Sequence, residues 1–358
     1  MSIASAITAA QGKVAAAYTA ISNKGGTLPA TQNLSNMPTA INSIPTGGGT
    51  GYTELPPYQV TNGVATRRSK ALTGNEFGDI TEIDSQGMYY AFYGCIGLTG
   101  ALDLSSLTTI GYQGMHSAFY GCTGLTSVDL SSITTIGSSN GMQNTFYNCT
   151  GLTGVDLSSL TTISGSQGMQ NTFYNCIGLT GALDLSSLTT ISGSTSMNYT
   201  FYKCTGLTSV DLSSLTTISG SNGMQNTFYN CTGLTSVDLS SLTTISGSNG
   251  MYSTFYGCTG LTSVDLSSLT TIGSNGMYST FYGCKNLEHV YFRALTTTSF
   301  GSYTNQFNNM LQNTGTTKTH TLHFPSNLSS KISGLTGYPT FGGTSGYVTL
   351  AFDLPATS

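Results

Sequence analysis

The chain has 358 residues, of which only 7% are charged and 45 are glycine, and its formal net charge is −4. This balance argues against nucleic-acid binding, and no run approaches the ~18 consecutive apolar residues of a membrane helix, so we expect no membrane insertion. The first basic residue is Lys13, and Ser, Thr and Gln interrupt the stretch before it, so we expect no secretory signal there.

Residues 1–24 are predicted to form a helix with a heptad seam. Its apolar positions are spaced 4, 3, 4, 3 and 4 residues apart: Ile3, Ile7, Ala10, Val14, Ala17 and Ile21. Such a seam is typical of helices that associate. We therefore predict an oligomerising or docking helix and a homo-oligomer, and the alternative is an amphipathic helix packed on its own chain.

Residues 25–60 are rich in glycine and proline and are predicted to be a linker or anchor segment. Within it, the sequence GTLPATQNLSNMPTAI at residues 26–41 resembles an N-terminal module of phage tail and fibre proteins. That resemblance implies docking onto other virion proteins. Residues 61–94 are predicted to be an N-terminal cap that ends in a half-repeat.

Residues 95–286 are an array of repeats. The eight cysteines, which occupy one position of each unit, are spaced 27, 27, 27, 28, 27, 27 and 26 residues apart. A fixed period in this range indicates a solenoid, in which each unit buries its apolar face against its neighbours.

The unit at residues 125–151 shows the expected course of one turn of the solenoid. It opens with L-x-x-V-x-L, so Val128 and Leu130 point inward from a strand and Asp129 points outward. Ile133 and Ile136 continue the inner lining along a second edge, and a Gly-Ser-Ser-Asn-Gly turn follows. The inward set then continues at spacings of four and three residues with Met142, Phe146 and Cys149, which predicts a short helix.

These units resemble the BspA-type leucine-rich repeats of bacterial surface proteins and phage virion proteins. The sequence TFYNCTGLTSVDLSSLTTI at residues 227–245 carries the likeness, which extends over roughly residues 80–300. The resemblance implies an α/β-type solenoid, a right-handed leucine-rich-repeat-like coil of ~27-residue units. It also implies adhesion and protein or glycan binding.

Residues 287–358 are predicted to be a degenerate repeat followed by a C-terminal cap. Tyr291 stands where the strand aspartate stood, and Thr319–Phe324 and Tyr347–Phe352 are expected strands. Terminal repeats must differ from the others, because an open apolar end aggregates. Two units also carry one extra residue just before the strand, at Gly100 and Gly181.

The strand aspartates form the first candidate ligand-binding set: Asp103, Asp129, Asp156, Asp184, Asp211, Asp238 and Asp265. Stacked strands lie ~4.8 Å apart, so we expect mutual repulsion to raise the carboxyl pKa values or to attract cations. Structural Ca²⁺ is one interpretation. The other is a solvated row whose neighbouring Ser and Thr hydroxyls donate hydrogen bonds. No cofactor and no dedicated metal site are expected otherwise.

The cysteines are predicted to be a row of buried, reduced thiols, a structural core ladder: Cys95, Cys122, Cys149, Cys176, Cys204, Cys231, Cys258 and Cys284. Their side chains should point the same way, which does not suit disulfide bonds. The C-x₂-C spacing typical of zinc sites does not occur in the sequence.

Tyrosine follows the inward phenylalanine in every unit and supplies the second candidate ligand-binding set: Tyr147, Tyr174, Tyr229 and Tyr256. A row of tyrosines can stack on sugar rings or contact a protein partner. The alternative is stacking between successive units with the hydroxyls in water.

Catalysis has little support, because no G-x-S-x-G, P-loop, H-E-x-x-H or G-x-G-x-x-G motif is present. His320 and His323, three apart in an expected strand, should face opposite ways. The sequence therefore predicts a phage virion structural protein, a tail or fibre component that displays a surface for a host receptor or glycan. The alternatives are a BspA-like adhesin on the bacterial cell surface and, with less support, a polysaccharide-degrading enzyme.

Overall fold

The computed structural model describes residues 58–61, 64–67, 77, 80–296, 298–314 and 318–356. The chain divides into two compact units, Met1–Leu55 and Pro56–Ser358, and all described residues belong to the second. The predicted helix 1–24 and most of the predicted linker 25–60 lie outside the described residues. The first described residues form a hairpin, in which β1 (Tyr58–Thr61) pairs antiparallel with β2 (Val64–Arg67).

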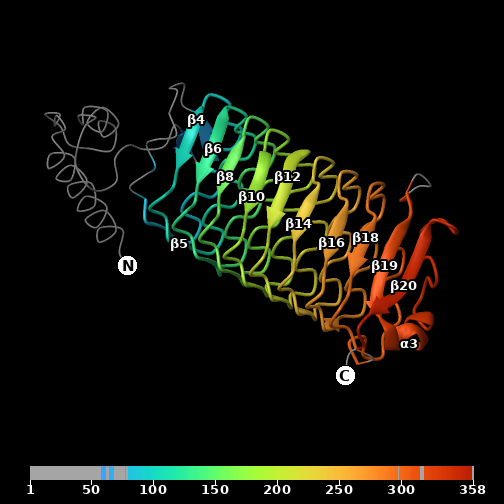
Figure 1. Ribbon diagram of the computed structural model, residues 1–358. Coiled ribbons are helices and arrows are strands. Elements are labelled where there is room, and N and C mark those ends of the chain that lie inside the picture. The colour runs from blue at the N-terminus through green and yellow to red at the C-terminus, as the bar shows by residue number, and fades with distance from the viewer. Residues whose placement is uncertain are drawn as a thin grey trace, which may run out of the picture. The chain divides into compact units, whose positions relative to one another are not determined.

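The repeats wind into a parallel β-solenoid, as predicted. Figure 1 shows the strands of its main face side by side along the array. They form a three-stranded sheet, β4-β6-β8, and a seven-stranded sheet, β10-β12-β14-β16-β18-β19-β20. Their bounds are β4 Gly100–Asp103, β6 Leu125–Asp129, β8 Gly154–Asp156, β10 Thr180–Asp184, β12 Gly206–Asp211, β14 Ser236–Asp238, β16 Ser263–Asp265, β18 His289–Tyr291, β19 His320–Pro325 and β20 Val348–Leu354.

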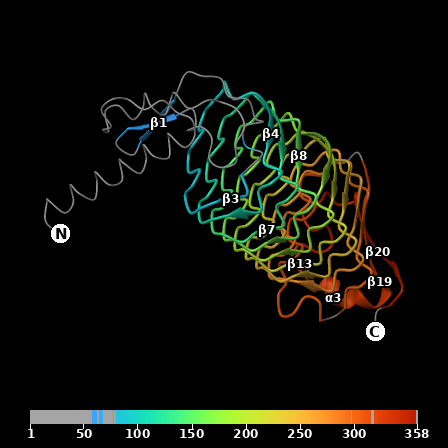
Figure 2. The ribbon, with the colours of Figure 1, turned by 90° about the vertical axis from the view of Figure 1, so that its left-hand side faces the viewer.

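A second side of the solenoid consists of two-residue strands with the sequence Thr-Ile in nearly every turn (Figure 2). They are β3 Glu82–Ile83, β5 Thr109–Ile110, β7 Thr135–Ile136, β9 Thr162–Ile163, β11 Thr190–Ile191, β13 Thr217–Ile218, β15 Thr244–Ile245 and β17 Thr271–Ile272. Each isoleucine is buried, and within the two sheets, β3-β5 and β7 to β17, successive isoleucines pair in register. This is the second inner edge that the sequence predicted.

The third side corrects one prediction, because the Met142–Cys149 segment is a series of turns and not a short helix. Alternate N–H groups leave the segment: Met142 N donates to Gly168 O and Phe146 N to Thr172 O in the next turn of the solenoid, both at 2.8 Å. The N–H groups between them close local turns, as when Thr145 N donates to Met142 O at 3.2 Å. A helix would need all of these groups for its own i−4 bonds.

Asparagine permits the backbone conformation that this turn series requires. Asn140, Asn144 and Asn148 have φ angles of 57°, 56° and 59°, so every fourth residue is left-handed. Asparagine is the non-glycine residue that tolerates this region best. The predicted inward positions are nevertheless confirmed, because Met142, Phe146 and Cys149 are fully buried.

The extra residues before two strands are β-bulges. The register shifts between Gly100 and Ala101 in β4 and between Gly181 and Ala182 in β10. Both glycines have positive φ, 87° and 79°, a conformation that only glycine adopts without strain. The insertion is therefore absorbed ahead of the strand, and the residues that follow stay in register.

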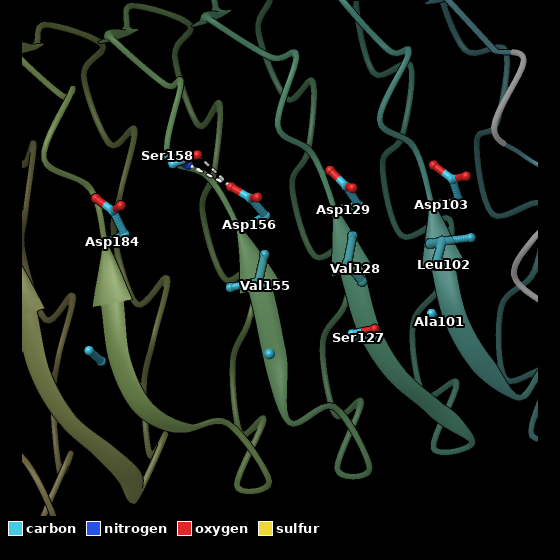
Figure 3. A pocket seen from close by; sticks show the side chains of 12 residues that line it. Ala101, Leu102, Asp103, Ser127, Val128, Asp129, Val155, Asp156, Ser158 and Asp184 are labelled. Carbon is cyan, nitrogen blue, oxygen red and sulfur yellow. Dashed lines mark hydrogen bonds between the residues drawn. The ribbon is translucent and has the colours of Figure 1, made fainter.

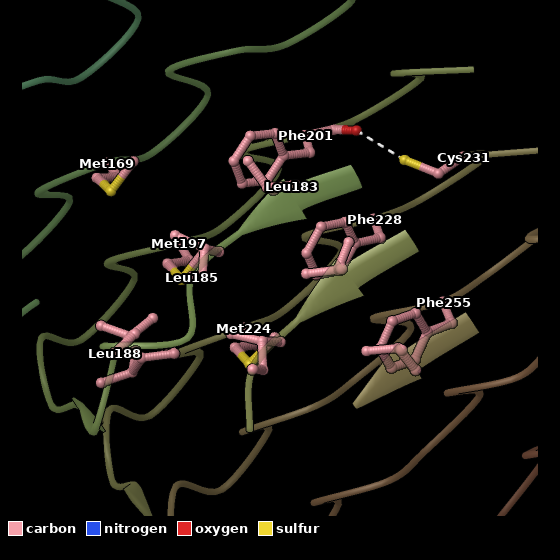
Figure 4. Packing of buried hydrophobic residues seen from close by; sticks show 14 of the residues in the cluster. Met169, Leu183, Leu185, Leu188, Met197, Phe201, Met224, Phe228, Cys231 and Phe255 are labelled. Carbon is pink, nitrogen blue, oxygen red and sulfur yellow. Dashed lines mark hydrogen bonds between the residues drawn. The ribbon is translucent and has the colours of Figure 1, made fainter. Parts of the chain in front are cut away.

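The core is one continuous column of identical side chains stacked turn on turn (Figure 4). From Phe92 to Phe281, successive phenylalanine rings are nearly parallel with centroids 5.2–5.9 Å apart. Rows of leucine, isoleucine and methionine lie beside them. Every internal turn is thus covered on both sides by a copy of itself.

The C-terminal segment continues the solenoid. The predicted strands near 319–324 and 347–352 are confirmed as β19 and β20. β19 pairs parallel with β18, and β20 pairs parallel with β19. Between them lie the 3₁₀ helix η2 (Ser326–Leu328) and the helix α3 (Ser329–Ser333), the α-helix of the described residues. No repeat contains an α-helix within this described part.

Candidate binding face

The outer face of the main sheet presents the predicted aspartates as one row, the Asp row. The strand pairing sets one group of these aspartates side by side in the first sheet and another in the second: Asp103, Asp129 and Asp156, then Asp184, Asp211, Asp238 and Asp265. Figure 3 shows the first four of these carboxylates projecting from β4, β6, β8 and β10. Beyond Asp265 the row ends, because Tyr291 of β18 and His323 of β19 take the equivalent positions.

Each carboxylate of the Asp row is held by the serine two residues further on. The serine N–H groups donate to the Asp Oδ1 atoms at 2.8–3.0 Å in all seven turns. At Asp103 and Asp156 the serine hydroxyl also donates, at 2.7 Å. This is the local turn that aspartate forms with its own backbone, and it fixes the carboxylates before any ligand arrives.

The expectation of raised carboxyl pKa values is wrong at two positions. At Asp103, hydrogen bonds from the Ser105 hydroxyl and N–H lower the carboxyl pKa below its ordinary value. At Asp184, the Ser186 N–H and hydroxyl lower the pKa in the same way. Donors that favour the ionised form outweigh the partial burial that raises the pKa. The Asp-x-Ser spacing was the sequence signal for this.

A shallow hollow lies beside the Asp row over β4, β6, β8 and β10. Its floor is formed by the small residues two positions before each aspartate: Ala101, Ser127, Gly154 and Ala182. Because these side chains are short, the edges of Val155 and of the flanking aspartates remain accessible in the hollow. The hollow was not predicted, although three of these units carry alanine or glycine where the later units carry serine.

The predicted ligand-binding tyrosines lie in a continuous stack on the turn side. The row runs from Tyr93 to Tyr282, with successive ring centroids 4.2–5.2 Å apart and planes within 27°. Tyr147, Tyr174, Tyr229 and Tyr256 are interior members, so each has a neighbouring ring on both faces. A sugar ring stacks on an aromatic face. Only the edges and hydroxyls of these four tyrosines are therefore available to a partner.

The stack predicts loss of stability at alkaline pH. Burial raises the pKa values of Tyr120, Tyr229 and Tyr256 above the ordinary 10.0, and neighbouring tyrosines add to the rise in Tyr120. The neutral form is then favoured in the folded state, so this stability is full below pH 10 and falls as the pH rises beyond it. Absorbance of tyrosinate should appear at higher pH in the native protein than in denaturant. Coincident titrations would contradict the stack.

Seven of the eight cysteines are buried, Cys95 is half-buried, and all are reduced. From Cys122 onward, each thiol donates to the phenylalanine carbonyl of the preceding turn, with Sγ···O distances of 3.0–3.2 Å. Threonines do the same for the methionine carbonyls, as when Thr172 Oγ1 donates to Met142 O at 2.7 Å. Cysteine thus fits as a small apolar residue with a weak donor.

The thiols are expected to be inert in the native protein. Burial raises the pKa of Cys176 to about 12, far from the reactive thiolate at neutral pH. A thiol reagent should label eight cysteines in denaturant and, in the native state, should react first at the half-buried Cys95. Rapid native labelling of Cys176 would show that the turns of the solenoid separate easily.

Amide ladders and a histidine cluster were not predicted. Side-chain amides join successive turns, for example Asn171 to Asn144 at 3.0 Å and Asn175 to Asn148 at 2.9 Å. Their signal was the recurrence of one amide residue at one position of the unit.

The histidine cluster lies at the C-terminal end of the main sheet. His323 Nδ1 is 3.0 Å from an Asp353 carboxylate oxygen, and His323 Nε2 is 3.1 Å from His289 Nδ1. His320, by contrast, is buried and contacts the Leu287 carbonyl, so the prediction that His320 and His323 face opposite ways is correct.

Neither a metal-binding cluster nor a membrane-spanning helix is found in the described part of the chain. Among the residues from 80 to 356 that the structure describes, no group of three or more His, Cys, Asp or Glu side chains is arranged to hold a metal ion. The Asp-row carboxylates instead bond their own serines. None of the helices in this part has the length and apolarity needed to cross a bilayer.

Comparison with known proteins agrees with this architecture. The family model described as BspA type leucine rich repeat region matches in six copies, over residues 79–197, 142–249 and 169–330. No curated protein matches the chain.

Several solved structures are similar to the chain at low sequence identity. A leucine-rich repeat protein from Bacteroides ovatus is 18% identical, with 83% of this chain and 91% of that one covered and a TM-score of 0.37. A leucine rich cell surface protein from Faecalibacterium prausnitzii is 17% identical, with 83% and 86% covered and a TM-score of 0.26. The T. pallidum leucine rich repeat protein is 21% identical, with 61% and 64% covered and a TM-score of 0.28.

Proposed function

Because this chain belongs to the BspA-type leucine-rich repeat family, we propose that it is a non-enzymatic binding protein displayed on a bacterial cell surface. The family supports adhesion to proteins or glycans as its role. The most regular outward feature of the described repeats is the Asp row, which borders a shallow hollow. Display on a rigid repeat surface is therefore the function that the chain is best suited to perform.

One observation carries the proposal: the carboxylates of the Asp row are evenly spaced and already fixed by hydrogen bonds. Each Oδ1 accepts from its own serine N–H, which leaves the second carboxylate oxygen directed to solvent. Fixed acceptors lose little conformational freedom on binding. A partner rich in hydroxyl groups, or one with basic side chains, can bond to several of them at once.

The hollow locates the contact within the Asp row. Over β4 to β10, Ala101, Gly154 and Ala182 lower the floor on both sides of Ser127, so a sugar ring or a side chain can sit beside Asp129 and Asp156. Further along, Ser209, Ser236 and Ser263 occupy the equivalent positions, and no alanine or glycine replaces them. The proposed binding site is thus the N-terminal half of the face.

The test compares matched pairs of isosteric variants in a glycan array and a cell-binding assay. The double variant Asp129→Asn, Asp156→Asn keeps the serine hydrogen bonds and removes two charges from the hollow. Binding should fall by about 10- to 100-fold, the cost of one to two weakened charge-assisted hydrogen bonds. The control, Asp238→Asn with Asp265→Asn, makes the same change outside the hollow and should bind almost normally. Equal loss in both would refute the hollow as the site.

The carboxylates of the Asp row also suggest an alternative function, the cleavage of polysaccharides. A pair of carboxylates serves glycoside hydrolysis when one is kept protonated as the acid. The serine donors lower the pKa of Asp103 and Asp184, which favours the opposite state. Release of reducing sugars from any surface polysaccharide by the purified chain would overturn the non-enzymatic proposal.

A second candidate function is that of a phage tail or fibre component. It is favoured by the segment at residues 26–41, whose resemblance to phage tail modules lies outside the described residues. Under this proposal the N-terminal segment docks onto other virion proteins and the solenoid meets a host receptor. Antibody labelling separates the two: signal on intact bacterial envelopes supports the adhesin, and signal on purified phage particles supports the virion protein.

A further inference from the structure

The last strand of the main sheet has an open edge. β20 (Val348–Leu354) pairs with β19 on one side, and among the described residues no strand pairs with its other side. Figure 1 shows β20 as the outermost arrow of the array. Natural proteins usually protect such an edge with lysine, proline or a covering segment, because its unpaired N–H and C=O groups recruit further strands.

The edge is almost uncharged. Between Gly334 and Ala356 the only charged residue is Asp353, and Pro355 follows the strand. The core also ends here: Val348, Leu350 and Phe352 are only partly buried, whereas Val264 and Leu322, which lie in the same row as Leu350, are 1% and 0% exposed. Each internal turn is covered by the next, and among the described residues no further turn covers these three.

The opposite end of the solenoid is different. There Phe77 packs edge-on against Phe92 and Phe119, with ring centroids 5.3 and 5.9 Å apart, ahead of the first main-sheet strand. The N-terminal turn, with β3 (Glu82–Ile83), also lies ahead of β4. A head-to-tail stack would join β20 to β4 of another copy and extend without limit. It would meet a core that Phe77 already covers, although β4 too has no strand on its outer side among the described residues.

We propose that β20 pairs antiparallel with β20 of a second copy, which joins two solenoids through their C-terminal ends. A two-fold axis at Ala351 sets Ala351 against its own copy, Leu350 against Phe352 and Thr349 against Asp353. Apolar residues meet apolar residues on the core side, and on the outer side a hydroxyl faces a carboxylate. Such a self-matching contact closes after two copies.

The backbone of β20 suits this register. His320 N donates to Tyr347 O at 2.8 Å, so the polar groups of Tyr347 face β19. These groups alternate along a strand, and those of Val348 and Leu350 therefore point to the open edge. The register with β19 is regular from Val348 to Ala351 and shifts between Ala351 and Leu354, so the alternation is regular up to the proposed axis. In an antiparallel pair centred on Ala351, Leu350 and Phe352 then exchange hydrogen bonds.

The experiment places opposite charges on the two-fold axis of the full chain. Ala351 lies on the outer face, and side chains directly opposite in an antiparallel pair have Cβ atoms about 4.5–5.5 Å apart. Ala351→Lys and Ala351→Glu should each weaken dimerisation by roughly ten-fold or more through self-repulsion. An equimolar mixture of the two should restore it. Association is followed by energy transfer between donor- and acceptor-labelled copies.

Two further measurements make the outcome decisive. Ser236→Lys changes an exposed residue of the same face in β14, outside the hollow, and should leave dimerisation unchanged. Thermal unfolding of all variants should show intact solenoids. In the wild type, the amides of β20 should become protected from hydrogen exchange as protein concentration rises. Concentration-independent exchange at β20, or charge variants that associate like the wild type, would overturn the proposal and leave the function of the Asp row unaffected.

Discussion

Truncation of Phe201 to alanine is expected to lower the free energy of unfolding by about 3–5 kcal/mol. The ring is fully buried between Phe173 and Phe228, with centroids 5.3 and 5.4 Å away and planes within 5°. Its loss opens a cavity that two adjoining turns share, and the close hydrogen bonds between turns leave little room for collapse. Chemical denaturation followed by circular dichroism measures the effect.

Phe201→Leu and Tyr202→Ala serve as controls for this substitution. Leucine keeps most of the buried volume, so its cost should be clearly smaller than that of alanine. Tyr202 belongs to the partly exposed stack beside the core, and its removal should cost less than the loss of the buried ring. A Phe201→Ala protein as stable as the wild type would mean that the phenylalanine column is not a shared core.

Because successive turns contact only their neighbours, the position of the damage matters as well as its size. A solenoid unfolds less cooperatively when one interface between repeats is weakened. Phe201 lies near the middle of the array, so its loss should broaden the transition into two phases, one for each half. The same substitution at Phe119, close to the N-terminal end, should leave a long intact array and one main transition.

The period of the sequence was sufficient to predict the solenoid and its inward rows. Seven cysteines, the phenylalanines and the Thr-Ile isoleucines are buried where the 27-residue spacing placed them. Spacing was not sufficient to distinguish a helix from a turn series at Met142–Cys149. Both present residues four and three apart to the core, and the difference lies in where the backbone N–H groups donate, which depends on the neighbouring turn.

The candidate site was predictable only in part, for a similar reason. That the aspartates form one outward row followed from strand alternation, but the sign of the pKa shift depended on a local hydrogen bond from the serine two residues on. The His289–His323–Asp353 contacts join three strands of unequal sequence. These residues do not recur at the 27-residue period, so only the strand pairing in the structure shows that they are in contact.

Gly220→Ala is expected to destabilise the solenoid by about 3 kcal/mol, near the upper end of overpacking costs. A Cβ atom at Gly220 would lie 2.0 Å from the carbonyl oxygen of Gly193 in the preceding turn, and one at Gly247 would lie 2.0 Å from that of Gly220. Backbone cannot rotate away as a side chain can, so the two turns must separate. The free energy of unfolding from urea titration measures the effect.

Gly154→Ala is the matched control, because it makes the same chemical change in the same array. A Cβ atom there meets nothing within 4 Å, and the residue lies in β8, where alanine restricts the unfolded chain more than glycine does. Its stability should equal or slightly exceed that of the wild type. If both variants were equally destabilised, the cost would come from glycine's conformational freedom and not from the approach of one turn to the next. A large loss at Gly220 alone would show that close backbone contact sets the spacing of the turns, and hence the spacing of the carboxylates that successive turns carry on the main sheet.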